Sequence, residues 1–372
     1  MTKQKITKKV DPIILAVVFL LLIYGLVMIS SAGVVVSKAR FEDEYYFFRH
    51  QLFFGVLPGV ILLLVVQKIN YIFWRKISVP FFIVSLVLLL LVFVPGFGVK
   101  LQGASRWINL GHISFQPTEM MKLALILYLA TWFEAKGRKI KDFREGLVPF
   151  TGILALVGFL IILQPDVGTL GAISVIALTM FFVAGAPIRF IGTLVGAGIF
   201  LLLILIKIEP YRMNRFISFM NPEVDPQGIG YQISQALIAI GSGGIFGLGL
   251  GQSRQKFNYL PEPIGDSIFA IVGEELGMIG AAALLVLFIL FALRGLKIAK
   301  NAPDTFAALV AVGISVWIVF QALINIMAIV GLVPLTGITL PFVSYGSTSL
   351  VFVLVGVGIL LNISKHSKLD FG

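Results

Sequence analysis

Long runs of apolar residues are the dominant pattern along this chain. A helix rises about 1.5 Å per residue, so a run of roughly 18 to 25 apolar residues crosses about 30 Å of hydrocarbon. Ten runs predict membrane-spanning helices, at residues 12–33, 50–67, 78–95, 117–135, 146–163, 167–185, 188–207, 266–292, 306–330 and 346–363. The pattern predicts an all-α polytopic membrane protein with a single ten-helix domain at 12–363, flanked by tails at 1–11 and 364–372.

The longest polar stretch, near residues 208–265, separates the seventh and eighth runs. Within it, YQISQALIAI (Tyr231–Ile240) is too short to cross a bilayer but carries apolar residues at helical spacing. Ile233, Leu237 and Ile240 would share one stripe of a helix that lies in the membrane interface. We expect one large loop that packs on the membrane.

The distribution of Lys and Arg sets the expected orientation. Basic residues crowd the N-terminal tail and every second short loop, whereas the intervening short loops hold few. By the positive-inside rule, both termini face the cytoplasm and the large loop faces outward. The net charge of +11 is mostly this topological excess, so it does not indicate a nucleic-acid partner.

Composition agrees with this class of protein. Hydrophobic residues make up 58% of the chain and charged residues 13%, which is more apolar side chain than a soluble domain can bury. The absence of cysteine excludes disulfides and thiolate metal sites. The three histidines, His50, His112 and His366, are too scattered to indicate a histidine-based metal or nucleophile site.

Ionisable residues from distant segments are expected at the outward-facing end. Glu119 and Lys122 open the fourth run, Asp166 lies between the fifth and sixth, and Asp266 opens the eighth. A charge near the bilayer centre costs at least about 2.5 to 3.5 kcal/mol, so such residues need partners or a function. These four side chains could line one outward-facing cavity.

Each of these residues also has a structural interpretation. Glu119 and Lys122 are three residues apart on one helix, so they form either a structural ion pair or a pair that also contacts substrate. Asp166 and Asp266 both precede helices, where a carboxylate can cap free backbone N–H groups. The residues alone leave these alternatives open.

The helix after Asp266 carries two more carboxylates, Glu274 and Glu275. They lie about 100° apart around a helix, so they cannot both share the face of Asp266, and at least one is expected to make a structural hydrogen bond. Gly273 and Gly277 do share that face, and their spacing predicts close helix packing.

Further polar residues are candidates for binding. Arg212 and Arg215 in the large loop are either solvated charges or a clamp for a diphosphate, since guanidinium groups pair with phosphate oxygens through two hydrogen bonds. SYGSTS (Ser344–Ser349) would hydrogen-bond either sugar hydroxyls or backbone groups.

Five stretches, in this order, resemble the SEDS family (shape, elongation, division and sporulation) of bacterial cell-wall synthesis. They are RWINLGHISFQPTEMMKLALILYLA (Arg106–Ala130), QPDVGT (Gln164–Thr169), the segment Tyr211–Pro263, GDSIFAIVGEELG (Gly265–Gly277) and PFVSYGSTSL (Pro341–Leu350). Within the family, GQSRQKFNYLPEP and GEELG are more similar to the division branch (FtsW) than to the elongation branch (RodA).

The resemblance implies a ten-helix peptidoglycan glycosyltransferase that polymerises lipid II outside the cytoplasmic membrane and releases undecaprenyl pyrophosphate. It implies a class B penicillin-binding protein as transpeptidase partner, other membrane proteins of the division machinery, and a divalent cation (Mg²⁺ or Mn²⁺) without an organic cofactor. By it, Asp266 is the catalytic aspartate. The expected substrate-binding residues are Arg106, Glu119, Lys122, Asp166, Arg212, Arg215, Ser344 and Ser349.

The chain departs from the family pattern at two places. His-Thr-Asp-Phe is common where this chain has Ile264, Gly265, Asp266 and Ser267, and Gly-Gly-Ser-Ser where it has Gly346, Ser347, Thr348 and Ser349. The first departure leaves no histidine beside the aspartate, so the base must be a carboxylate. We hypothesise that Asp266 deprotonates the acceptor 4-hydroxyl. A lipid-linked precursor flippase and a scaffold for the transpeptidase remain alternatives.

Overall fold

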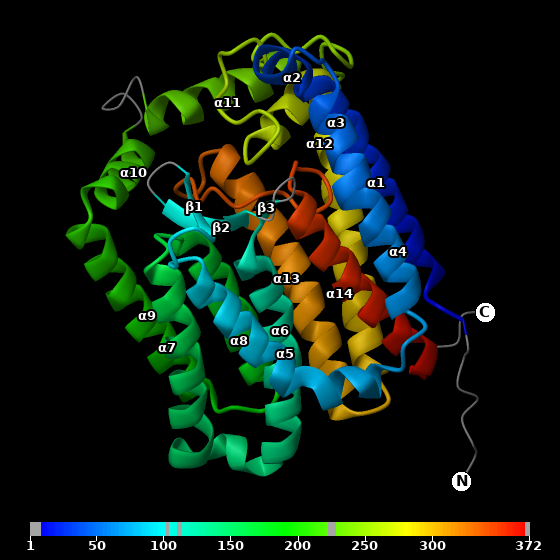
Figure 1. Ribbon diagram of the computed structural model, residues 1–372, viewed down its shortest axis with the longest axis vertical. Helices are drawn as coiled ribbons and strands as arrows, with labels where there is room; N and C mark the ends of the chain where they lie inside the picture. Colours follow the sequence, from blue (N-terminus) through cyan, green and yellow to red (C-terminus); the bar gives the residue numbers. More distant parts are fainter. Residues whose placement is uncertain (1–8, 102–103, 110–113, 222–227, 369–372) are drawn as a thin grey trace.

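The computed structural model describes residues 9–101, 104–109, 114–221 and 228–368, and it is predominantly helical (Figure 1). Each of the ten predicted runs falls on a helix. These are α1 (Pro12–Ala32), the continuous α3 (Tyr46–Gln51), η1 (Leu52–Val56) and α4 (Leu57–Val66), α5 (Tyr71–Leu91), α6 (Pro117–Lys136), α7 (Val148–Ile162), α8 (Val167–Val183), α9 (Ile188–Ile208), α12 (Ile268–Lys300), α13 (Thr305–Ile329) and α14 (Ser347–His366). Within the described residues, eight helices are long and apolar enough to cross a membrane. The all-α polytopic prediction is confirmed.

Two predicted boundaries are wrong for the same reason. Helix α5 begins at Tyr71, seven residues before the predicted start at 78, with Asn70 as its N-cap. Helix α12 continues to Lys300, beyond the predicted end at 292. Both extensions contain basic residues, which the sequence pattern assigned to loops. They belong to helices because a long basic side chain can reach the membrane surface from a helix end.

The interior of the bundle is formed around α6, α13 and α14, in each of which most residues are buried. Helix α13 packs against α6, α8, α12 and α14. By contrast, α9 has only Phe190 and Leu205 buried and stands at the edge of the bundle (Figure 1). The polar residues of α13 are therefore enclosed on several sides.

Both ends of the described chain meet at one end of the bundle. The backbone N–H of Asp11, the N-cap of α1, donates to Ser364 Oγ near the end of α14 at 3.0 Å. The Asp11 carboxylate also pairs with Arg294 near the end of α12, at 2.6 Å. Asp266 immediately precedes the start of α12, and so lies at the opposite end of this helix from Arg294; we call this end of the bundle the site end.

A small antiparallel sheet, which the sequence pattern did not predict, lies between α5 and α6. Its strands are β1 (Gly98–Leu101), β2 (Ala104–Asn109) and β3 (Ser114–Phe115), in the order β1-β2-β3. The strands are too short for a clear alternation of apolar and polar residues. The sheet carries Arg106 toward the loop before α8.

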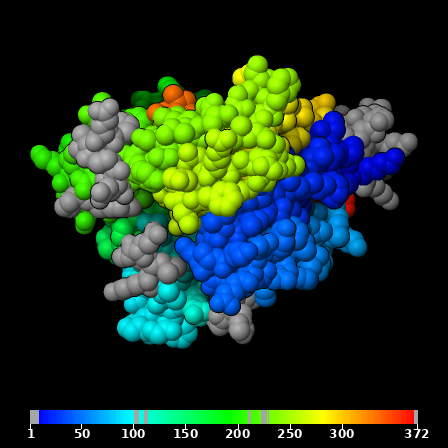
Figure 2. Space-filling view, turned by 90° about the horizontal axis from the view of Figure 1, so that it is seen from above, coloured from blue at the N-terminus to red at the C-terminus, as the bar shows by residue number. Residues whose placement is uncertain are grey.

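The large loop contains helices of its own, α10 (Pro210–Met220) and α11 (Ile229–Gly243). The predicted stripe on α11 is displaced, because Ile233, Ala236 and Ala239 are buried while Leu237 is 45% exposed. The reason is that α11 packs against α12, so protein contacts decide which face is buried. Seen from the site end, α11 and the segment after it cover much of the face and adjoin α1, α2 (Val34–Phe41) and α3 (Figure 2).

Candidate functional site

The carboxylate of Asp266 lies in a turn immediately before α12. The helix begins at Ile268, and Ser267 occupies its N-cap position. Asp266 is partly buried, and its Oδ1 atom is enclosed without a hydrogen-bond partner. Asp266 is therefore not the cap of α12, and one oxygen of its carboxylate is left unpaired by the described residues.

The surroundings of Asp266 alter its acidity. Burial raises the pKa of Asp266 to about 6, and the negative charge of Glu262 adds to the rise. The positive charge of Arg215 and hydrogen bonds from the Asp266 backbone N–H and the Gln232 side chain oppose it. A carboxylate with this pKa is ionised at neutral pH yet basic enough to accept a proton.

Helix α13 holds the backbone on either side of the site. The side-chain amide of Asn325 donates to the carbonyl of Asp266 and to the carbonyl of Ile338, both at 2.8 Å. Its Oδ1 atom is buried and has no hydrogen-bond partner. One side chain thus fixes the Asp266 turn against the segment 335–345, which connects α13 to α14.

Segment 335–345 also holds the residues before Asp266. Ser344 Oγ accepts from the backbone N–H of Leu340 at 2.8 Å and donates to the carbonyl of Gly265 at 2.7 Å. The backbone N–H of Tyr345 donates to the carbonyl of Ile264 at 2.8 Å. Of the two uses considered for Ser344, these contacts serve the backbone.

Glu119 and Lys122 form a buried ion pair on α6. Lys122 Nζ lies 2.8 Å from Glu119 Oε1 and 2.8 Å from Gln321 Oε1 on α13. It also lies 5.2 Å from the centroid of the Trp317 ring, a cation–π distance. Ser349 Oγ donates to Glu119 Oε2 at 2.9 Å. The pair joins α6, α13 and the first turn of α14.

The ion pair and Asp266 are connected along one face of α13. Gln321, which binds Lys122, donates through Nε2 to the carbonyl of Thr339 at 3.1 Å. Asn325, which binds Asp266, follows four residues later, about 6 Å along the helix. Two segments far apart in the sequence are thus held by adjacent turns of α13.

Asp166 and Arg106 organise the start of α8. Asp166 is the N-cap of α8 and accepts from the backbone N–H of Thr169 at 3.1 Å and from the Thr169 hydroxyl at 2.8 Å. Arg106 donates to the carbonyls of Gln164, at 3.0 Å, and Pro165. The capping interpretation of Asp166 accounts for its contacts.

The two arginines of α10 have different surroundings. Arg215 donates to the carbonyl of Leu335 at 3.1 Å, and its charge acts on Asp266. Arg212 donates to the carbonyl of Leu205 on α9 at 3.2 Å. Arg215 therefore lies beside the site, whereas the Arg212 contact points to α9.

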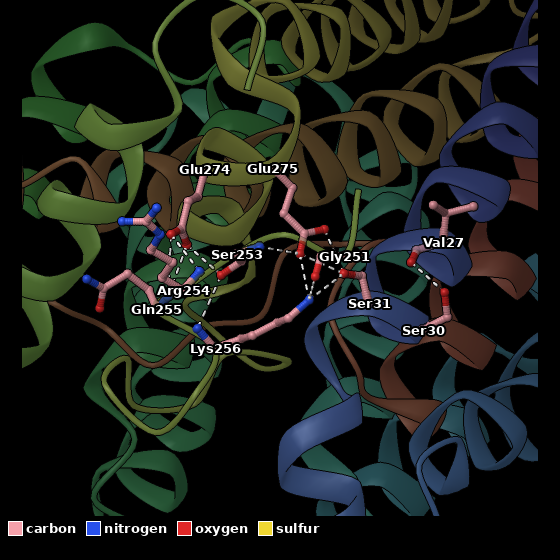
Figure 3. Close-up of polar contacts among 10 residues, drawn as sticks. All are labelled: Val27, Ser30, Ser31, Gly251, Ser253, Arg254, Gln255, Lys256, Glu274 and Glu275. Atoms are coloured by element: carbon pink, nitrogen blue, oxygen red, sulfur yellow. Dashed lines mark hydrogen bonds and ion pairs between the residues drawn. The ribbon is translucent and has the colours of Figure 1, made fainter. Parts of the chain in front are cut away.

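Glu274 and Glu275 both have structural partners, as Figure 3 shows. Glu274 accepts from Ser253 Oγ and from the backbone N–H of Arg254 at 2.9 Å. Glu275 accepts from Ser31 Oγ on α1 at 2.7 Å and pairs with Lys256 Nζ at 3.0 Å. The expectation that at least one makes a structural hydrogen bond is confirmed for both.

The paired glycines of α12 do not act as one packing stripe. Gly273 contacts α11, since a Cβ there would lie 3.0 Å from the Ile240 side chain. Gly277 has φ 65 and ψ −164, which breaks the helix. Gly277 is also closely packed, since a Cβ there would lie 2.3 Å from the backbone nitrogen of Gly247. The predicted close packing is therefore right for both glycines, but the positive φ of Gly277 turns the chain, so they do not form one helix face.

Several residues of the site were not predicted. They are Gln232, Glu262, Trp317, Gln321 and Asn325, all in contact with Asp266, Lys122 or the turns that hold them. A signal existed for two of them, because Gln321 and Asn325 are polar residues within an otherwise apolar helix, where partners are expected.

The predicted divalent cation is tested by the residues present. Among residues 9–101, 104–109, 114–221 and 228–368, no group of three or more His, Cys, Asp and Glu side chains is placed to hold a metal ion. Mg²⁺, however, is often held by one or two carboxylates together with substrate phosphates. The exposed Glu262 and the unpartnered Oδ1 of Asp266 fit that smaller requirement.

Comparison with known proteins assigns the chain to a family. The family of cell cycle proteins that comprises FtsW, RodA and SpoVE matches residues 12–369, so this chain belongs to that family. The resemblance seen in the sequence is confirmed.

Two curated relatives show the extent of the similarity. Stage V sporulation protein E of Bacillus subtilis is 46% identical, over 97% of this chain and 99% of the relative. The probable peptidoglycan glycosyltransferase FtsW of Trichlorobacter lovleyi is 41% identical, over 96% of this chain and 94% of the relative.

Solved structures confirm the fold. A structure described as the structural coordination of polymerization and crosslinking by a peptidoglycan synthase complex matches 97% of this chain and 99% of the matched chain, with TM-score 0.80 and 26% identity. The rod shape determining protein RodA of Thermus thermophilus matches 97% of this chain and 98% of its own, with TM-score 0.71 and 27% identity.

Proposed function

We propose that this chain is a peptidoglycan glycosyltransferase that polymerises lipid II, with Asp266 as the general base. The observation that carries the proposal is the carboxylate of Asp266, whose enclosed Oδ1 has no hydrogen-bond partner and whose pKa is about 6. The glycosyltransferase names of relatives that cover nearly the whole chain support it.

In the proposed reaction, Asp266 accepts the proton of the 4-hydroxyl of the acceptor GlcNAc. The hydroxyl oxygen then bonds to the anomeric carbon of the donor MurNAc, and the bond from that carbon to the diphosphate oxygen breaks. Undecaprenyl pyrophosphate leaves with the bonding electrons. This single displacement inverts the anomeric carbon and produces a β-1,4 linkage.

The leaving diphosphate gains negative charge, which a fixed cation stabilises in the transition state. Arg215 is better supported for this role than Arg212, because its charge acts on Asp266. A divalent cation held by Glu262 and the diphosphate would supply further positive charge.

The contacts of the other predicted substrate-binding residues support a structural role for them around the site. Lys122 is bound by Glu119 and Gln321, and Glu119 is bound by Ser349. A second group, made up of Arg106, Asp166 and Ser344, binds backbone carbonyl or N–H groups next to the site. These contacts brace the helices and turns that present Asp266.

We further propose that the site end faces the outside of the cytoplasmic membrane and that both termini are cytoplasmic. The positive-inside rule supports this, because the end with the termini also holds Arg75, Lys136 and Lys139, each paired with a glutamate. The matched peptidoglycan synthase complex supports a class B penicillin-binding protein as partner.

Purified protein supplied with lipid II and Mg²⁺, alone and with the transpeptidase, tests the activity. Glycan strands on a gel that lysozyme digests are the expected product. Transfer of lipid II across a vesicle membrane without polymer would favour the flippase, and transpeptidase binding without either activity would favour the scaffold.

The cellular role is proposed to be septal wall synthesis. Relatives named FtsW, at 37–41% identity, support the division branch, and the sporulation relative belongs to the same family. Depletion of the protein should block septum formation while growth in length continues. A loss of rod shape with normal septa would instead favour the elongation role.

A further inference from the structure

The segment that follows α11 forms a tight hook at residues 244–251. Gly244, Gly247, Gly249 and Gly251 have φ values of 56, 81, 105 and 80, a backbone region that side chains with a Cβ rarely adopt. No ionisable residue occurs between Gly241 and Ser253. The hook is thus sharply folded and uncharged.

The hook pairs with the break in α12. The backbone N–H groups of Met278 and Ile279 donate to the carbonyls of Gly244, at 2.9 Å, and Ile245, at 3.2 Å. In return, the backbone N–H groups of Leu248 and Gly249 donate to the backbone carbonyls of Glu274, at 2.9 Å, and Glu275, at 3.0 Å. These four bonds satisfy backbone polar groups that would otherwise be costly to remove from water.

Two contacts between α1 and α12 define how deep the hook lies. Ser31, in the last turn of α1, binds Glu275, and the hydroxyl of Tyr24 donates to the carbonyl of Gly280 at 3.2 Å. Tyr24 and Ser31 are about 10 Å apart along α1. Residues 278–279, which hold the hook, therefore lie beside the part of α1 between Tyr24 and Ser31. This part is nearer the middle of the membrane than the end of α1.

The apolar side chains of the hook point away from the protein. Phe246 is 80% exposed and Leu250 is 54% exposed, and they continue the exposed surface of Met278 and Ile279 on the spanning part of α12. Two cations follow the hook: Arg254 is exposed, and Lys256 is directed inward to Glu275 (Figure 3). Large contiguous apolar patches of this kind mark contact surfaces.

We propose that the hook inserts into the apolar layer of the bilayer leaflet at the site end and contacts lipid acyl chains. Continuity with the lipid-facing surface of α12 supports lipid as the occupant. The hook would then anchor the start of the segment whose other end carries Asp266, and hold it at constant depth.

Spin labelling tests the proposal directly, because the natural chain has no cysteine. A nitroxide is attached to Phe246→Cys in the full-length protein in lipid nanodiscs. Ile289→Cys, at an exposed position within α12, is the lipid control, and Glu44→Cys, in an exposed charged loop, is the water control. Leu250→Cys provides a second hook site if Phe246→Cys fails to fold.

The expected result is high accessibility to oxygen and low accessibility to a water-soluble nickel complex at the hook, as at Ile289. Accessibility to nickel like that of Glu44 would overturn the proposal. Low accessibility to both reagents would also overturn it, since it would mean that protein rather than lipid covers the hook.

Discussion

The side-chain amide of Asn325 donates to the backbone carbonyl of Asp266 at 2.8 Å and to that of Ile338 at the same distance. A turn without such a tie would sample many conformations, and fixing each residue has an entropic cost of about 1 to 2 kcal/mol. Helix α13 therefore determines where the Asp266 carboxylate points, although Asn325 itself makes no hydrogen bond to that carboxylate.

Replacing Asn325 by Ala should reduce polymerisation more than stability explains. The variant leaves two buried carbonyls without this donor, which costs about 1 to 3 kcal/mol each, and it frees the Asp266 turn. We expect the turnover rate to fall at least about tenfold while the KM for lipid II changes little.

Asn362→Ala is the matched control for this prediction. Asn362 is also a buried asparagine that ties two backbone groups, those of Gln67 and Tyr71, but at the end of the bundle away from Asp266. It should lower the melting temperature without a selective loss of turnover. Equal losses of turnover in the two variants would contradict a positioning role for Asn325.

Asp266→Asn should abolish most polymerisation while the fold is retained. The substitution keeps the shape but removes the base, and general-base catalysis contributes about 10²- to 10⁴-fold. Gel-resolved glycan from purified lipid II measures the loss. A reduction well under tenfold would mean that Asp266 has only a structural role.

The rate of polymerisation should rise with pH around a midpoint near 6. Asp266 acts as a base only when ionised, and its pKa is about 6. Glu262→Gln removes a negative charge that raises this pKa, so the rising limb should move to lower pH. Arg215→Gln removes an opposing positive charge and should move it to higher pH, and shifts in the reverse directions would argue against Asp266 as the titrating group.

Asp266→Asn should also raise thermal stability at neutral pH. The folded-state pKa of Asp266 lies above its ordinary value of 3.8, so folding disfavours the ionised form. The destabilisation is fully present above the folded-state pKa and is lost below pH 3.8. Melting temperatures of the two proteins should therefore converge as the pH falls from 7 to 4.

Breaking the Glu119–Lys122 pair on one side only should be strongly destabilising. Lys122→Met leaves Glu119 buried without its cation, and loss of one partner of a buried pair costs about 3 to 5 kcal/mol. The double variant Glu119→Gln/Lys122→Met should recover much of the loss. Unfolding in detergent measures this, and additive losses would show that the two charges do not stabilise each other.

Much of the fold could be predicted from the chain because hydrocarbon imposes a strong local rule. A spanning helix must be about 20 apolar residues long and must satisfy its own backbone. The ten runs and the Lys and Arg pattern are therefore legible without tertiary contacts. The ends of helices such as α5 and α12 are harder to predict from the sequence, because basic residues are tolerated in a helix at a membrane surface.

The chain by itself determined the class of protein, the ten spans and the presence of Asp266 between a polar loop and an apolar helix. Only the tertiary structure decided that Asp166 caps α8, that Glu274 binds the large loop while Glu275 joins it to α1, and that Asn325 fixes the Asp266 turn. The physical reason is that hydrophobic periodicity is a local property. The partner of a buried polar group lies dozens to hundreds of residues away and is set by how the helices pack.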